Sequence, residues 1–129
     1  MTILPSHILN TLLERTKQGQ TPCFTPQDWQ AWAGQTFAQD AWNAVALILA
    51  RKFLSGEVTF EQADWIINDF WLLVHTGRVE VDTQAYAQPW AEVFFAFDAG
   101  EYHHKPDKSD DPVRDRTIPM LKKVLAGAA

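Results

Sequence analysis

The chain has few of the residues and motifs that carry covalent chemistry. Only one of its 129 residues is cysteine, so no intramolecular disulfide can form, and a reducing compartment is expected. Cys23 stands between Pro22 and Phe24, without the neighbours that mark a catalytic cysteine. The six glycines are scattered rather than gathered into a phosphate-binding loop, and neither GxSxG nor HExxH occurs. These absences argue against an enzyme and predict no cofactor.

Long apolar runs are also missing. No stretch reaches the roughly 18 apolar residues that a membrane-spanning helix needs. The first residues lack the basic segment and apolar core of a signal peptide. The length suits one domain, residues 1–129, with a core of its own. We therefore expect a cytoplasmic protein of one domain with no membrane partner.

Positive charge is scarce over most of the chain. Residues 1–101 hold 12 acids and 5 Lys or Arg, whereas residues 102–129 hold 4 acids and 6 Lys or Arg. An acidic body disfavours nucleic-acid binding, because that binding requires neutralisation of phosphates. It favours a basic protein partner, which opposite charge steers into contact.

Apolar residues recur at helical spacing through most of the chain. Thr25 followed by Pro26 is typical of a helix start, and Thr59 with Gln62 forms a capping-box pattern. The short alternating run 78–81 is interpreted as an extended connection, since no partner strand is evident. We predict an all-α, single-domain bundle of five to seven helices. The helices are expected over residues 5–17, 26–33, 36–55, 59–76, 84–98 and 117–126.

Residues 90–104 combine an apolar run with a polar end. Asp98 and Glu101 are three residues apart, so a helix would place them on one face, where two negative charges oppose the helix dipole. Either they serve a partner or a metal, or Lys and Arg from the following segment neutralise them. His103 and His104 have suitable ligand chemistry, but the side chains of adjacent residues diverge. We therefore favour an exposed loop over a metal site.

Acids and aromatic residues also alternate along the second half of the chain. The acids at 64, 69, 98 and 101 would converge if the helices at 59–76 and 84–98 packed side by side. The aromatic residues among them are typical either of a core or of the anchors of a protein interface, and the pattern leaves both open. The aromatic residues concerned are Trp65, Trp71, Tyr86, Trp90 and Tyr102.

Three segments together resemble a known class of protein. They read FLSGEVTFEQADWIIND, FFAFDAGEYHH and DPVRDRTIPML, and they fall within residues 50–121. EQAD (61–64) and AFDAGE (96–101) carry most of the likeness. The pattern resembles small acidic helical immunity proteins of bacterial contact-dependent inhibition and related polymorphic toxin systems.

That resemblance implies a function by binding. An immunity protein binds its cognate toxin domain, often a basic nuclease, and blocks it without catalysis. Its acidic surface would cover the toxin's substrate cleft or a site that the toxin needs for a cofactor protein. A helical adaptor without a toxin partner, or a metal-dependent enzyme, remains as the alternative. The contact residues we expect are Asp64, Asp69, Glu80, Asp82, Asp98, Glu101 and Tyr102.

Overall fold

The structure is a computed structural model that describes residues 4–33, 39–75 and 88–128. These ranges form α-helices with no strand among them, which confirms the predicted all-α bundle. A five-residue π-helix, η2 (Val113–Thr117), leads directly into the last helix. The helices are α1 (Pro5–Lys17), α2 (Pro26–Ala33), α3 (Gln39–Leu54), α4 (Phe60–His75), α5 (Pro89–Ala99) and α6 (Ile118–Ala128).

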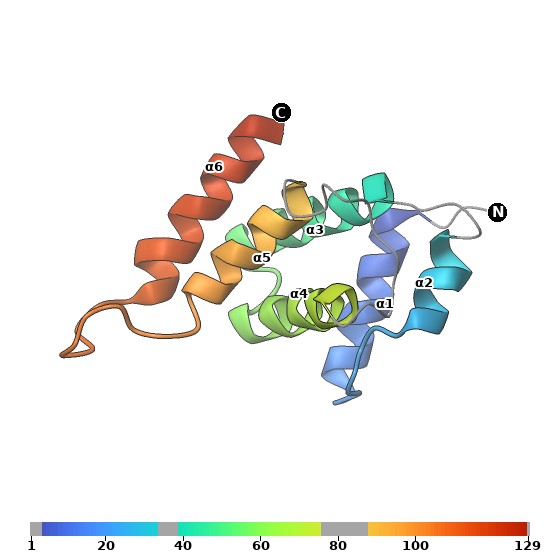
Figure 1. The fold of residues 1–129 in the computed structure, drawn as a ribbon, viewed down its shortest axis with the longest axis horizontal. Helices are drawn as coiled ribbons and strands as arrows, with labels where there is room; N and C mark the ends of the chain where they lie inside the picture. The colour runs from blue at the N-terminus through green and yellow to red at the C-terminus, as the bar shows by residue number, and fades with distance from the viewer. Residues whose placement is uncertain (1–3, 34–38, 76–87, 129) are drawn as a thin grey trace.

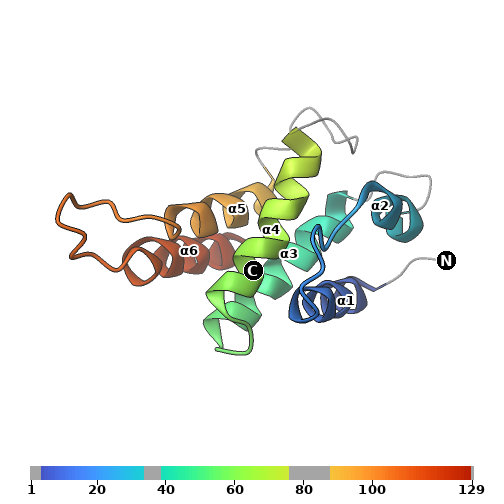
Figure 2. The same cartoon turned by 90° about the horizontal axis from the view of Figure 1, so that it is seen from below.

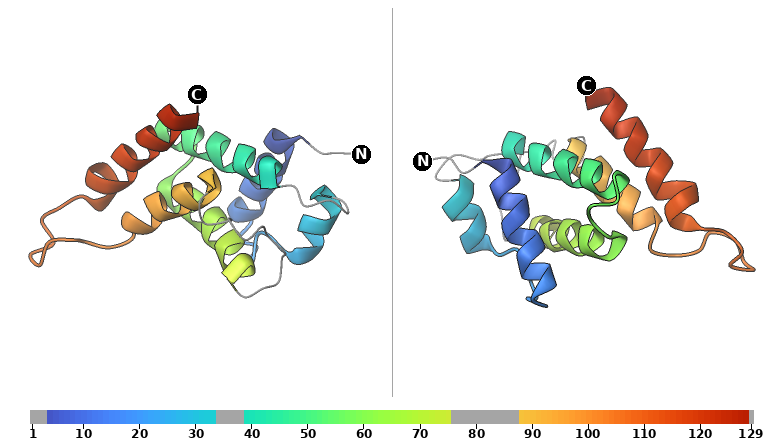
Figure 3. Two further views of the ribbon diagram at one scale, coloured as in Figure 1. Left: turned by 45° about the horizontal axis from the view of Figure 1, so that its top comes forward. Right: turned by 180° about the vertical axis from the view of Figure 1, so that it is seen from behind.

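Helices α3 and α4 lie at the middle of the bundle (Figure 1). On one side α1 packs against both of them, and α2 lies beyond it at the N-terminal end (Figure 2). On the other side α5 contacts α3, α4, η2 and α6, which surround it on several sides. The connection between α5 and η2 projects from this end of the bundle (Figure 3).

Aromatic rings fill much of the core. Trp42 of α3 stacks on Phe70 of α4 with 4.0 Å between ring centroids, and Phe70 meets the edge of Trp90 at 4.9 Å. Phe24, from the connection before α2, closes this group at 5.3 Å from Trp42. Trp90 is fully buried, so it belongs to the core rather than to a binding surface.

The predicted helix starts form as expected at α2 and α4. The Thr25 hydroxyl accepts a hydrogen bond from the Asp28 backbone N–H, and the Asp28 carboxylate accepts one from the Thr25 N–H. Thr59 and Gln62 exchange the same two bonds. Each pair satisfies backbone donors that a helix start leaves without intrahelical partners.

Helix α5 begins at Pro89, whereas the sequence pattern placed its start near residue 84. Gln88 supplies no side-chain cap. Instead Asn43 of α3 accepts a hydrogen bond of 3.1 Å from the Trp90 N–H, the first free donor after proline. Residues 78–81 and the predicted helical residues 36–38, 76 and 84–87 lie outside the described residues.

The π-helix η2 explains how the chain accommodates Pro119. The helical run begins before Pro119, whose ring would meet the carbonyl group four residues earlier in a continuous α-helix. The wider π turn separates the backbone at that point. The predicted last helix, 117–126, is therefore observed as η2 joined to α6, which starts at Ile118.

Candidate functional site

Three carboxylates meet where α4 lies beside the end of α5. Asp64 comes from the second turn of α4, Asp98 from the last turn of α5, and Glu101 follows Gly100, the residue that caps that helix. The Asn68 amide donates to the Asp64 backbone carbonyl at 2.7 Å and reaches the Glu101 carboxylate at 3.4 Å. We call Asp64, Asp98 and Glu101 the carboxylate cluster. Three of the four acids that were expected to converge therefore lie together, and Asp69 does not join them.

The end of α5 is fixed by close packing at Gly100. A Cβ atom there would collide with the Thr117 hydroxyl and press on the Phe60 ring. The Thr117 hydroxyl donates to the Ala96 carbonyl oxygen at 2.7 Å, which holds η2 against α5. This packing fixes the backbone between Asp98 and Glu101, and so sets where the two acids leave the helix.

Ionisation of the carboxylate cluster is unfavourable. Partial burial, followed by the nearby charge of Glu101, raises the pKa of Asp64 to about 7. The same two causes raise the pKa of Asp98. Atom Oδ1 of Asp64 is buried and has no hydrogen-bond partner. A cationic donor placed here would relieve both the repulsion and the missing hydrogen bond.

No basic side chain of the described residues neutralises the cluster. The ion pairs among residues 4–33, 39–75 and 88–128 involve Asp28, Glu14, Glu57, Asp110 and Asp115 instead. The alternative in which Lys or Arg from the following segment pairs with Asp98 and Glu101 is therefore not observed in this part of the chain.

Tyr102, which follows Glu101 in the sequence, has an exposed aromatic ring. Its side chain is 54% exposed, and its ring centroid lies 4.9 Å from that of His104. Trp65 and Trp71 are half-buried and pack against the core. Of the described aromatic residues expected near the acids, Tyr102 is the one in a position to act as a surface anchor.

Asp69 is placed away from the other predicted acids. Its carboxylate accepts a hydrogen bond of 2.8 Å from the backbone N–H of Cys23, in the connection between α1 and α2. Cys23 is fully buried, and its burial, followed by the Asp69 carboxylate, raises the pKa of the thiol. Asp69 thus stabilises the fold, and Cys23 packs in the core as a small side chain. Glu80, Asp82 and Tyr86 lie outside the described residues.

Both adjacent histidines make polar contacts with residues close to them in the sequence. His104 Nε2 lies 2.7 Å from the Ala99 carbonyl oxygen, and His103 Nδ1 lies 3.2 Å from Asp110 Oδ1. The Asp110 carboxylate also accepts the backbone N–H groups of His104 and Lys105, which lower its pKa to about 2. The role of Asp110 was missed because nothing in the sequence shows which backbone groups the loop turns toward it.

In the described residues, no three His, Cys, Asp or Glu side chains are arranged as metal ligands. None of the described helices combines the length and the apolar character needed to cross a bilayer. The chain matches no family model, no curated protein and no solved structure. Its function must therefore be argued from the residues and their geometry.

Proposed function

We propose that the chain is an immunity protein that binds and neutralises a cognate basic toxin domain in the cytoplasm, without catalysis. The observation that carries the proposal is the carboxylate cluster, in which Asp64, Asp98 and Glu101 converge with no basic partner among the described residues. Such a cluster is unfavourable in the free chain and becomes favourable when a cation binds.

The chemistry of the cluster favours an Arg side chain of the partner. A guanidinium group is planar and carries five donors, so it can bond two carboxylates at once. It would supply a donor for Oδ1 of Asp64 and place positive charge between Asp64 and Glu101. A bound cation also lowers the pKa of Asp64, so the cluster ionises fully in the complex.

The surrounding surface supports an interface of the ordinary kind. Tyr102, next to Glu101 in the sequence, offers an exposed ring of the kind that anchors protein interfaces. The acidic body, with 12 acids against 5 Lys or Arg in residues 1–101, would speed the encounter with a basic domain. A nuclease suits this arrangement, because its nucleic-acid cleft presents the basic residues that an acidic surface can cover.

The test is a pull-down of the tagged chain from its native host, with partners identified by mass spectrometry. We expect one stoichiometric basic protein encoded beside the chain, whose toxicity is suppressed by coexpression. The variant Asp98→Lys with Glu101→Lys should weaken binding at least about tenfold, because it puts repulsive charge at the contact.

A matched variant separates local from overall charge. Glu14→Lys with Asp40→Lys changes the net charge equally at exposed positions of α1 and α3 outside the cluster. This control should retain the partner with only a modest loss of association rate. Equal retention by both variants would show that the cluster is not the contact. A captured small molecule without any protein partner would overturn the immunity proposal itself.

A further inference from the structure

Helix α5 is buried on most of its circumference and open along one stripe. Trp90, Val93, Phe94 and Phe97 are buried, whereas Glu92 and Phe95 are exposed. These two residues are three apart, so they lie on the same face of the helix. The chain therefore leaves a large apolar side chain, 43% exposed, beside an exposed acid on a helix whose other residues are mostly buried.

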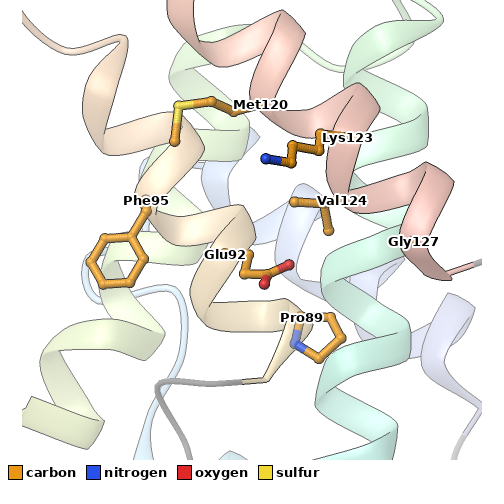
Figure 4. A pocket seen from close by; sticks show the side chains of 7 residues that line it. All are labelled: Pro89, Glu92, Phe95, Met120, Lys123, Val124 and Gly127. Atoms are coloured by element: carbon orange, nitrogen blue, oxygen red, sulfur yellow. The ribbon is translucent and has the colours of Figure 1, made fainter.

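This stripe forms one wall of a groove between α5 and α6 (Figure 4). The groove has a volume of about 550 Å³. Its lining is mainly apolar, and Met120 on the opposite wall is itself 36% exposed. The lining residues are Pro89, Glu92 and Phe95 of α5, and Met120, Lys123, Val124 and Gly127 of α6.

Two opposite charges face the groove from its two walls. Figure 4 shows the Glu92 carboxylate directed toward α6 and the Lys123 ammonium directed toward α5. Neither forms an ion pair among the residues that the structure describes. The groove thus presents one acid and one base, each able to pair with a charge brought by an occupant.

The exposed ring of Phe95 is restrained by two aromatic neighbours. Its ring meets the edge of Trp71 of α4 at 5.4 Å and that of Phe94 at 5.6 Å. Contacts on two sides already restrict the conformations of the Phe95 side chain. Less conformational entropy is therefore lost when a partner binds it. An exposed aromatic ring with a fixed orientation is typical of the central contact of a protein interface.

We propose that the occupant of this groove is a second copy of the chain, bound about a twofold axis. In a twofold interface residue i meets residue j of the partner while j meets i. A surface with one acid and one base is therefore complementary to itself, and Glu92 of each copy pairs with Lys123 of the other. An occupant charged with one sign would leave one of the two groups unpaired in an apolar contact, which is costly.

The apolar residues fit the same arrangement. Each copy brings one Phe95 and one Met120, and the groove of the other copy offers apolar surface between two helix walls. Burying these side chains supplies the attraction, and the paired charges fix the register. The groove and the carboxylate cluster share no residue, so this proposal does not depend on toxin binding.

The experiment measures molar mass in solution, by sedimentation equilibrium, for the wild type and for two single variants. Glu92→Lys places two bases in each groove, and Lys123→Glu places two acids there. We expect the wild type to dimerise and each variant to associate at least about tenfold more weakly, because both reciprocal pairs become repulsive.

The decisive sample is an equimolar mixture of the two variants. In a heterodimer one copy carries Lys at 92 and 123 and the other carries Glu at both, so both pairs are attractive again. We expect the mixture to form dimers that neither variant forms alone. Exposed substitutions on a helix should leave the far-UV circular dichroism and the melting temperature nearly unchanged.

The controls make the same charge changes outside the groove. Glu61→Lys in α4 and Lys122→Glu in α6 alter exposed residues that do not line it, and both variants should dimerise like the wild type. A monomeric wild type at all accessible concentrations would overturn the proposal. So would dimers of either single variant as strong as those of the wild type, or a mixture that stays monomeric.

Discussion

The side-chain oxygen of Asn43 accepts a hydrogen bond of 3.1 Å from the backbone N–H of Trp90. A residue of α3 thereby caps the first turn of α5, a role usually taken by the residue before the helix. The Asn43 amide nitrogen donates to the Gln88 side chain at 2.9 Å, so the amide is used on both sides. Asn43 is only 8% exposed, and its bond to the Trp90 N–H is buried.

Asn43→Ala should therefore destabilise the chain by about 1–3 kcal/mol, because it removes a cap and leaves a buried N–H without a partner. Asn43→Asp keeps the acceptor for Trp90 and should cost less at a pH where the carboxylate is ionised. Urea unfolding followed by tryptophan fluorescence measures both. Asn10→Ala, at an exposed position of α1, is the control and should change stability little. Equal losses at positions 43 and 10 would contradict the tertiary cap.

Gly100→Ala should be more costly than its backbone conformation suggests. The φ angle of Gly100 is −86°, which any residue adopts, but an added Cβ would collide with the Thr117 hydroxyl. We expect a loss of about 2 kcal/mol or more, since both η2 and Phe60 would have to move. Gly127→Ala meets nothing within 4 Å and should be neutral or slightly stabilising in α6. Thermal melting of the two variants separates a requirement for space from a general effect of glycine.

Substitution of Asp69 distinguishes a role in stability from a role in partner binding. Asp69→Ala should cost about 2 kcal/mol of unfolding free energy, because the buried Cys23 N–H loses its acceptor. Asp69→Asn retains a side-chain oxygen at that place and should lose clearly less. If Asp69 is structural only, the folded Asn variant binds the partner as tightly as the wild type. Weaker binding by that variant at unchanged stability would place Asp69 in the interface.

The pH dependence of stability should reveal the carboxylate cluster. Asp64 has a folded-state pKa of about 7 against a usual value of 3.8, so the folded chain holds this proton more tightly than the unfolded chain. The resulting stability is fully present below about pH 4 and is lost as the pH rises from about 4 to about 7.

Asp64→Asn removes this dependence. At about pH 8 the variant should be more stable than the wild type by about 1 kcal/mol, allowing for solvent screening at a half-buried site. The difference should shrink toward pH 4, where Asp64 is protonated in both states. Denaturant titrations at several pH values measure it. A constant difference over this range would show that Asp64 ionises normally.

Local signals in the sequence determined much of the fold. The first two helices begin and end near their predicted positions because proline, threonine and glycine act on the backbone within one turn. The start of α4 follows from Thr59 and Gln62 for the same reason. Helix α5 starts at Pro89 rather than near residue 84, where the sequence pattern predicted its start, because Asn43 completes the cap from another helix.

Side-chain roles at the candidate site depended on tertiary contacts. Asp64 and Asp69 belong to one helix and were predicted for one surface, yet the first meets Glu101 and the second meets Cys23. Five residues along an α-helix turn a side chain by roughly 140° away from its starting direction. Which neighbour each side chain meets then depends on how the helices pack. The same packing left Glu92 and Phe95 exposed on a helix whose other residues are mostly buried. Sequence alone determined the helices and the acidic character, because both arise from nearby residues. Only the tertiary structure decided which acids lack a basic neighbour, because that depends on segments distant in sequence.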